Sequence, residues 1–406
     1  MINDASTLRL PLVLGLAALA LAAFGTGSAR AGCGEEGNDD IAFQGSGKLL
    51  LGACGKKQAA VIRLDRSGRL DPTFAEDGSL GPWTSNFPAH PAVTPEGKVL
   101  VQMTLGKGKG RRVVLRRFFA NGKLDRSFAG GNAPVPTGGS VPEEIHVFGQ
   151  PQGTAVVAYY GENDGCWGND CAERTNYLQL YRYSATGKRI AEASHYTEYW
   201  NLTNVTMAPN GDILAAGNDL EYGTVTFLRT KPTLKTRAAR KTGEEFGSGP
   251  QEILPGAGTS VLISGNEAGV GRYRSDWSLV ESFGDRGFVD CGSSGERSLR
   301  LLASLPSGAF LAEGDSTRCP LMRYQADGRP DPGFGSGGSV DLAGLGLVPP
   351  RYRLESIAVG PEGQFAIAFA NEDKPIVRIS RFTADGHLET GFGKGGVVTI
   401  RNFRPA

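Results

Sequence analysis

The chain has 406 residues, a formal net charge of +1, 40% hydrophobic residues and 59 glycines. The near-zero charge gives no reason to expect nucleic-acid binding, because a protein that neutralises phosphates carries a clear cationic excess. Glycine is about twice its usual share of roughly 7%, whereas glycine and proline together stay below the roughly 25–30% typical of low-complexity chains. The composition therefore indicates a globular chain with many tight turns and excludes a disordered one.

Residues 1–31 are predicted to be a cleaved signal peptide. Residues 10–24 form an uncharged apolar run that is too short for a comfortable membrane span, and Ala29 and Ala31 supply small residues at cleavage spacing. The alternatives are an uncleaved anchor and a lipid-modified Cys33, although a lipoprotein signal would carry an aliphatic residue in place of the arginine before Ala31. We expect the mature chain to be exported to the periplasm, the cell surface or the medium of a bacterium, with no transmembrane span.

All six cysteines lie after the predicted cleavage site, which in an exported protein predicts disulfides. Six cysteines allow fifteen pairings, and the spacing typical of a zinc site, with CxxC or paired Cys and His, is absent. The shortest loops would be closed by the pairs Cys166–Cys171, Cys33–Cys54 and Cys291–Cys319.

One motif recurs along the mature chain and divides it into seven units of about 54 residues. Each unit begins with a glycine-bearing turn and four or five apolar positions. An apolar strand with an arginine follows, then a second turn and, in the best copies, Leu-Asp, Phe and Gly-x-x-Gly. The arginines are Arg63, Arg117, Arg182, Arg229, Arg272, Arg323 and Arg381.

The repeat predicts an all-β protein, a seven-bladed β-propeller over residues 32–406. Short apolar runs between Gly, Asn, Asp and Pro turns indicate three or four strands per unit, without an amphipathic helix of normal length. Radial closure protects the edges of such sheets, whereas a parallel β-helix would have coils about half this long. The sequence leaves open whether N- and C-terminal strands share one closing sheet.

Four strings carry the pattern R-[LFY]-x-x-x-G-x-L-D-x-x-F-G-x-x-G most clearly, at 61–80, 114–131, 321–340 and 379–398. The pattern resembles the delta-60 repeat, a β-propeller repeat of exported bacterial proteins. It is fair in unit 5 and poor in units 3 and 4. The resemblance implies the propeller fold and bacterial export, and it implies no particular reaction.

The repeated arginines could form a ring of positive charge that binds an anion. In four units, however, an acid follows eight residues later, so we favour an arginine that packs across its blade and pairs with that carboxylate. The repeated phenylalanines are interpreted as packing between neighbouring blades. The acids are Asp71, Asp125, Asp331 and Glu389, and the phenylalanines are Phe74, Phe128, Phe283, Phe334 and Phe392.

Loops between the second and third strands of each unit should share one face of the propeller, which is our candidate binding surface. The loop at 106–112 is basic, whereas the loop at 161–171 and those of later units are rich in Asp, Asn and Glu. Ordinary solvated turns are the alternative. The candidate residues are Lys107, Lys109, Arg111, Arg112, Asp164, Trp167 and Asp170.

Two further segments are interpreted as surface structure without a ligand. Asp164, Asn169 and Asp170 offer oxygen ligands for calcium, but their spacing does not match an EF-hand loop, so a disulfide-closed surface loop is favoured. The basic stretch at 229–241 is interpreted as an irregular solvated turn, with contact to a polyanion as the alternative.

No catalytic signature appears: Gly-x-Ser-x-Gly, HExxH, Walker A and dinucleotide motifs are absent, and His90, His146, His195 and His387 lie in different units. We therefore expect an exported, monomeric binding or scaffolding module without cofactor or metal, whose partner is an envelope protein or a polysaccharide. The alternative is a hydrolase or lyase acting on a carbohydrate or lactone, with carboxylates from several blades gathered at the central channel.

Overall fold

The structure is a computed structural model that describes residues 41–45, 47–55, 58–84, 89–106, 112–137, 144–163, 166–167, 170–171, 175–198, 200–219, 224–242, 250–265, 269–290, 299–314, 320–371 and 376–401. The predicted signal peptide lies outside these residues. Their strands form seven four-stranded antiparallel sheets and one two-stranded hairpin. The described ranges contain no helix that is long and apolar enough to cross a membrane.

Each four-stranded sheet is one blade built from four consecutive strands of a unit. Blades 1 and 2 are β1 (Ile41–Gln44), β2 (Lys48–Gly55), β3 (Gln58–Leu64) and β4 (Ser79–Thr84), then β5 (His90–Val93), β6 (Val99–Leu105), β7 (Arg112–Phe118) and β8 (Ala133–Val135). Blade 3 is β9 (Glu144–Gly149), β10 (Ala155–Asn163), β13 (Thr175–Tyr183) and β14 (Arg189–Glu198), with the hairpin β11 (Cys166–Trp167) and β12 (Asp170–Cys171) between β10 and β13.

Blades 4 to 7 repeat the same order. Blade 4 is β15 (Trp200–Met207), β16 (Ile213–Asp219), β17 (Thr224–Thr230) and β18 (Thr236–Thr242), and blade 5 is β19 (Pro250–Pro255), β20 (Val261–Gly265), β21 (Gly269–Tyr273) and β22 (Phe288–Val289). Blade 6 is β23 (Leu299–Ser304), β24 (Phe310–Gly314), β25 (Leu321–Tyr324) and β26 (Ser339–Val340), and blade 7 is β27 (Tyr352–Val359), β28 (Phe365–Asn371), β29 (Ile376–Phe382) and β30 (Val397–Arg401).

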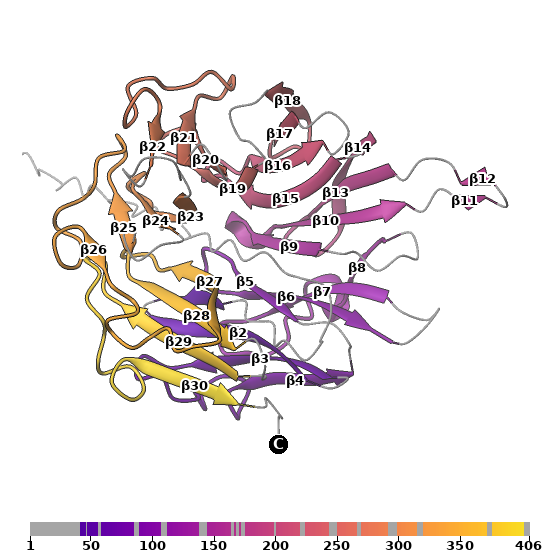
Figure 1. The fold of residues 1–406 in the computed structure, drawn as a ribbon. Helices are drawn as coiled ribbons and strands as arrows, with labels where there is room; N and C mark the ends of the chain where they lie inside the picture. The colour runs from indigo at the N-terminus through magenta and orange to yellow at the C-terminus, as the bar shows by residue number, and fades with distance from the viewer. Residues whose placement is uncertain are drawn as a thin grey trace, which may run out of the picture.

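The seven blades close into a ring, which confirms the predicted seven-bladed β-propeller. The first strand of each blade contacts the first strand of the next, in the order β1, β5, β9, β15, β19, β23, β27 and back to β1. Figure 1 shows blade 7, in yellow, beside blade 1, in indigo. Every sheet consists of consecutive strands, so the ring closes without an exchange of N- and C-terminal strands.

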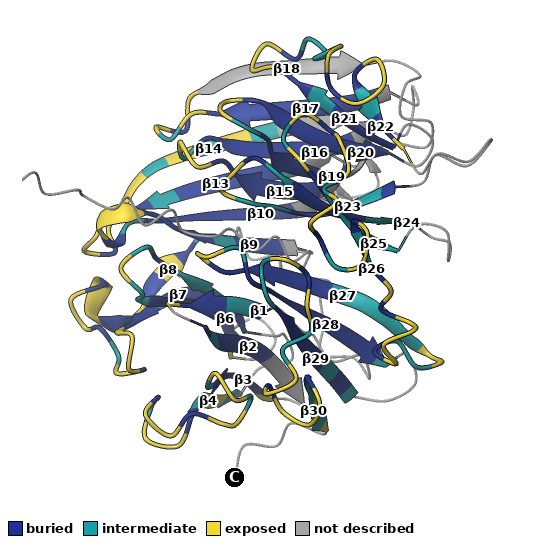
Figure 2. Cartoon of the chain, turned by 90° about the vertical axis from the view of Figure 1, so that its left-hand side faces the viewer, coloured by how far each residue is buried: buried dark blue, intermediate teal, exposed yellow. Residues whose placement is uncertain are grey.

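The hydrophobic core is divided among the blade junctions. Seven clusters of buried apolar side chains each combine residues of two neighbouring blades. The central strand β6, VLVQMTL, is buried along nearly its whole length because the neighbouring blades cover both of its faces. Figure 2 shows these buried strands and the exposed turns at their ends.

The repeated phenylalanines pack between blades, as the sequence predicts. Phe74 of blade 1 is fully buried in the cluster that it shares with blade 2, and Phe392 of blade 7 lies in the cluster shared with blade 1. The other three, Phe128, Phe283 and Phe334, are equally buried at their junctions.

The repeated arginines pair with the predicted carboxylates. The nitrogen–oxygen distances are 2.9 Å for Arg63–Asp71 and Arg117–Asp125, 2.8 Å for Arg323–Asp331 and 3.1 Å for Arg381–Glu389.

Each arginine also donates a hydrogen bond to a backbone carbonyl of the next blade, a contact that we call the arginine link. In blade 2, for example, Arg117 Nη1 donates to Gly153 O at 2.7 Å, and in blade 7 Arg381 Nη1 donates to Gly47 O of blade 1 at 2.7 Å. The guanidinium groups are thus used within the scaffold, and the structure does not support a ring that binds anions. The other links are Arg63 to Ala120, Arg182 to Pro232, Arg229 to Thr259, Arg272 to Ala326 and Arg323 to Ala384.

Blades 4 and 5 lack the acid eight residues after the arginine, and a different side chain of the same blade contacts the guanidinium. The arginine link to the next blade is kept. In blade 4, Arg229 Nε lies 3.3 Å from Asp212 Oδ2, and both side chains are buried. Asp212 occupies the turn position that Lys98 holds in blade 2. In blade 5, Ser260 takes this position and accepts a hydrogen bond from Arg272 Nε at 2.9 Å.

One sequence prediction about this region is wrong. The basic stretch at 229–241 is not an irregular turn, because it begins at the buried end of β17 and continues through a short turn into β18, which pairs with β17 through six residue pairs. An outermost strand has one face in contact with solvent, so a strand rich in Lys and Arg is compatible with this position.

Candidate functional site

The antiparallel topology defines two faces of the ring. Since strands alternate in direction, the loops between second and third strands lie on the same face as the connections between blades, which we call the loop face. The tight glycine turns between first and second strands lie on the opposite face. The first strand of every blade therefore begins at the loop face.

The predicted surface residues are only partly described. Arg112 begins β7 and is exposed at the loop face, whereas Lys107, Lys109, Arg111 and Asp164 lie outside the described residues. Trp167 and Asp170 face each other in the register of β11 and β12, a hairpin that Figure 1 places beyond the ends of β10 and β13. Their role in binding stays a prediction.

The predicted disulfides also stay predictions. Cys166 and Cys171 are direct partners in the β11–β12 register, as a short closure between them requires, and Cys54 lies on β2. Cys33, Cys291 and Cys319 lie outside the described residues.

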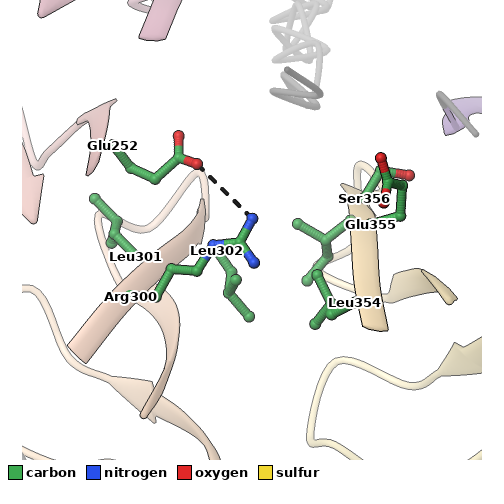
Figure 3. Close-up of a pocket in the computed structure, with 8 residues that line it drawn as sticks. Glu252, Arg300, Leu301, Leu302, Leu354, Glu355 and Ser356 are labelled. Atoms are coloured by element: carbon green, nitrogen blue, oxygen red, sulfur yellow. Dashed lines mark ion pairs between the residues drawn. The ribbon is translucent and has the colours of Figure 1, made fainter. Parts of the chain in front are cut away.

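A pocket at the centre of the ring is the candidate site. The alternative prediction from the sequence, an enzyme with carboxylates gathered at the central channel, pointed to this region, but the sequence did not identify the lining residues. The pocket lies between the first strands of blades 5, 6 and 7. Its cavity volume is about 30 Å³, within about 300 Å³ of free space that includes open solvent. Figure 3 shows Glu252 and Arg300 on one side and Leu354, Glu355 and Ser356 on the other. Arg300 and Glu252 are the second and third residues of β23 and β19, and residues 354–357 are the third to sixth of the eight residues of β27. The pocket therefore lies along the inner strands, from near their start at the loop face to their middle. The remaining lining residues are Leu301, Leu302 and Ile357.

Irregular strand pairing shapes the pocket. Each of the three strands carries one extra residue relative to its neighbour, which is Gln251 in β19, Leu302 in β23 and Glu355 in β27. An extra residue of this kind bends the strand and changes the direction of nearby side chains. Leu302 and Glu355 both line the pocket.

The charges on the β19–β23 side are close to one another without forming tight pairs. Arg300 Nη2 lies 4.0 Å from Glu252 Oε1, and Arg300 Nη1 lies 3.8 Å from Glu313 Oε1 on the neighbouring strand β24. Both distances exceed hydrogen-bond length. The Arg300 side chain is 42% exposed, against 15% for Glu252 and 22% for Glu313. Its guanidinium therefore faces the pocket with its hydrogen-bond donors unused by these carboxylates.

The two pocket carboxylates are held in place by other groups. Glu252 Oε2 accepts a hydrogen bond from Asn204 Nδ2 of β15 at 2.6 Å. Across the pocket, Glu355 Oε2 accepts one from Arg353 Nε at 2.9 Å. Glu313 differs from both, because burial raises the pKa of its carboxyl and the charge of Arg300 offsets this only in part.

Buried polar atoms beside Glu252 have unused hydrogen-bonding capacity. Asn204 is 1% exposed, and its Oδ1 accepts no hydrogen bond from the residues described. The Oγ of Ser264, the register partner of Glu252 on β20, likewise has no hydrogen-bond partner there. Among the residues that the structure describes, no group of three or more His, Cys, Asp or Glu side chains is arranged to hold a metal ion.

A sequence signal for this region existed. A polar residue stands at the fourth position from the end of the innermost strand in five blades, which are His90, His146, Asn204, Glu252 and Ser356. In each case the residue seven positions later occupies the same place in the turn between the first and second strands. These turn residues are Gly97, Gly153, Gly211, Thr259 and Gly363. The two histidines, which appear scattered in the sequence, therefore occupy equivalent places in the innermost strands of neighbouring blades.

No family model matches the chain, and no match was found among curated proteins. The solved structures that are similar to it include a protein from Lactobacillus plantarum, with a TM-score of 0.47, 10% identity and coverage of 87% of this chain and 99% of the other. A polysaccharide lyase has a TM-score of 0.38 and 10% identity over 74% of this chain and 75% of its own. Dipeptidyl peptidase 4 from Porphyromonas gingivalis has a TM-score of 0.41 and 10% identity over 89% and 60%. At these scores and identities, no activity is carried over to this chain.

Proposed function

We propose that this protein is an exported, monomeric binding module that takes part of a polysaccharide into the pocket between the first strands of blades 5, 6 and 7. The predicted signal peptide and the likeness of the repeats to the delta-60 repeat of exported bacterial proteins support export. Export would bring the chain into contact with envelope polysaccharides.

The observation that carries the proposal is the state of Arg300. Its guanidinium is substantially exposed and makes no hydrogen bond with any residue that the structure describes, although two carboxylates lie within 4.0 Å. A rigid ring holds these groups in place before a ligand arrives, which lowers the entropy that binding must overcome. Leu354, which is partly buried, supplies an apolar contact for a sugar ring at the pocket, whereas Leu302 is buried in the core.

Fixed carboxylates favour binding over catalysis. Glu252 and Glu355 are each oriented by a donor, Asn204 and Arg353, and act as stationary acceptors.

A hydrolase is the second candidate, and one observation favours it. Glu313 has a raised pKa and shares Arg300 with Glu252, and two carboxyl groups in different environments are the arrangement that glycosidases use as acid and base.

The pocket can be tested with a substitution that fills it. Leu354→Trp should weaken binding of the protein, expressed from its whole gene, to immobilised polysaccharides at least tenfold. The matched control is Ile190→Trp, which adds the same side chain at an exposed position of β14 in blade 3. Melting temperatures establish that both variants are folded. Equal binding by both variants would rule out the pocket as the binding site.

Turnover is measured on the same polysaccharides by the release of reducing ends. If the protein only binds, no reducing ends are released. Release by the wild type that disappears in Glu313→Gln would show that the protein is a hydrolase instead.

A further inference from the structure

The pocket's charges also indicate which kind of sugar it takes, an inference that rests on the proposed function. We infer that the pocket selects an uncharged sugar and holds two adjacent hydroxyl groups, one on each amino group of Arg300. One hydroxyl would join Arg300 to Glu252, and the other would join Arg300 to Glu313.

The two gaps beside Arg300 have a span that a hydroxyl bridges. A hydroxyl oxygen that accepts from a nitrogen at about 2.9 Å and donates to an oxygen at about 2.7 Å, at a tetrahedral angle, joins atoms about 4.6 Å apart. The observed separations of 4.0 Å and 3.8 Å are somewhat shorter than this and too long for direct hydrogen bonds, so the hydroxyl would lie beside the line that joins the two atoms. The two gaps begin at Nη2 and Nη1 of the same planar group, side by side as adjacent hydroxyls are on a sugar ring.

A hydroxyl suits these gaps because it donates and accepts at once. A carboxylate of the ligand could accept from Arg300 but would be repelled by Glu252, Glu313 and Glu355. An ammonium group could donate to the carboxylates but would be repelled by Arg300. Only a group with both capacities satisfies both sides.

A second observation near Glu252 points to a ligand or water that donates hydrogen bonds. Asn204, whose amide group contacts the pocket carboxylate Glu252 through Nδ2, is almost fully buried and its Oδ1 accepts nothing from the described residues. A buried acceptor of this kind costs free energy until a donor reaches it. The hydroxyl that bridges Arg300 and Glu252 uses its single proton on Glu252, so the donor for Asn204 Oδ1 would be a further hydroxyl of the same sugar or a water molecule.

The test compares neutral hexose oligosaccharides with oligomers of the corresponding uronic acids, both by titration calorimetry. The neutral sugars should bind, with an affinity that changes less than twofold between 0.05 and 0.5 M salt because no net charge is recognised. Glu252→Gln should weaken their binding about tenfold or more. Arg300→Lys should do the same, because an ammonium cannot present two parallel donors.

The sign of the Glu252→Gln effect separates the sugar classes. If the ligand were acidic, removing this carboxylate would tighten binding, and salt would weaken it. Glu192→Gln is the matched control, since Glu192 forms an exposed pair with Arg189 on β14 and should leave binding unchanged.

The outcomes distinguish the inference from the proposed function. Binding of uronic acid oligomers that Glu252→Gln tightens would overturn the inference and keep the pocket as a binding site. Binding of neutral sugars that none of the pocket variants affects would overturn both, as would the finding that neither neutral nor acidic oligosaccharides bind.

Discussion

Replacing Arg117 by methionine tests whether the arginine links hold neighbouring blades together. The side chains of Arg117 and Asp125 are 3% and 1% exposed, and their nitrogen–oxygen distance is 2.9 Å. Arg117 also donates to Gly153 O of blade 3 and lies over the ring of Phe128. Removing one partner of a buried ion pair costs about 3–5 kcal/mol. We expect about 3 kcal/mol, because Lys98 still contacts the remaining carboxylate at 2.9 Å.

Urea unfolding at neutral pH measures this loss, with tryptophan fluorescence and far-UV circular dichroism checked for coincident transitions. The matched control is Arg116→Met on the same strand, because Arg116 is less buried and, among the described residues, its side chain donates a hydrogen bond only to the exposed Asn132, at 2.8 Å. It should cost less than about 1 kcal/mol. Adding Asp125→Asn to Arg117→Met should recover part of the loss, since the buried charge disappears. Equal losses for Arg116→Met and Arg117→Met would refute the structural role of the link.

Two further predictions concern single residues of the scaffold. Gly122→Ala should lower the urea midpoint at least twice as much as Gly97→Ala. Both glycines have φ near +80°, so the backbone strain of the substitution is similar. A Cβ at Gly122 would lie 2.8 Å from Ala75 N of blade 1, whereas the nearest atom to a Cβ at Gly97 is 4.0 Å away. Burial opposes ionisation of Asp125, but hydrogen bonds from Ser127 and Lys98 together with the charge of Arg117 outweigh it and hold its pKa at about 2. A lowered pKa stabilises the fold above the unfolded value, so the stability advantage of the wild type over Asp125→Asn should shrink as pH falls from about 4 towards 2. Melting temperatures of both proteins at pH 7, 4 and 3 measure it, and an advantage that stays constant would contradict the assignment.

The number of blades was predictable because each sequence unit contains its own glycine-bearing turn and its own arginine, which can be counted. Blade 4 shows the limit of this reasoning. A search for an acid eight residues after Arg229 fails there, yet the arginine is paired, because Asp212 reaches it from the turn before β16. That partner precedes Arg229 by seventeen residues and is brought close by the pairing of β16 with β17. A motif with fixed spacing after the arginine cannot detect a partner that the neighbouring strand supplies.

The pocket was not predictable for a related reason. Its shape depends on single extra residues in three strands, and a strand with an extra residue has no distinct sequence pattern in a chain whose strands are all short and apolar. Arg300 and Glu252 are far apart in the chain and belong to different blades. Only the recurrence of a polar residue seven positions before the turn, as with Asn204, marked the innermost strands.

The junction between blades 7 and 1 has the apolar cluster and the arginine link, here from Arg381 to Gly47, that the other six junctions have. Its backbone hydrogen bond from Gly393 N to Ser67 O has counterparts at four of them among the described residues. Blade 7 therefore contacts blade 1 in the same way as each other blade contacts the next one. No junction is a structural seam, so circular permutants opened between other blades, with β30 joined to β1, should assemble the same ring. The fold of the ring then does not depend on which of the seven junctions holds the chain ends.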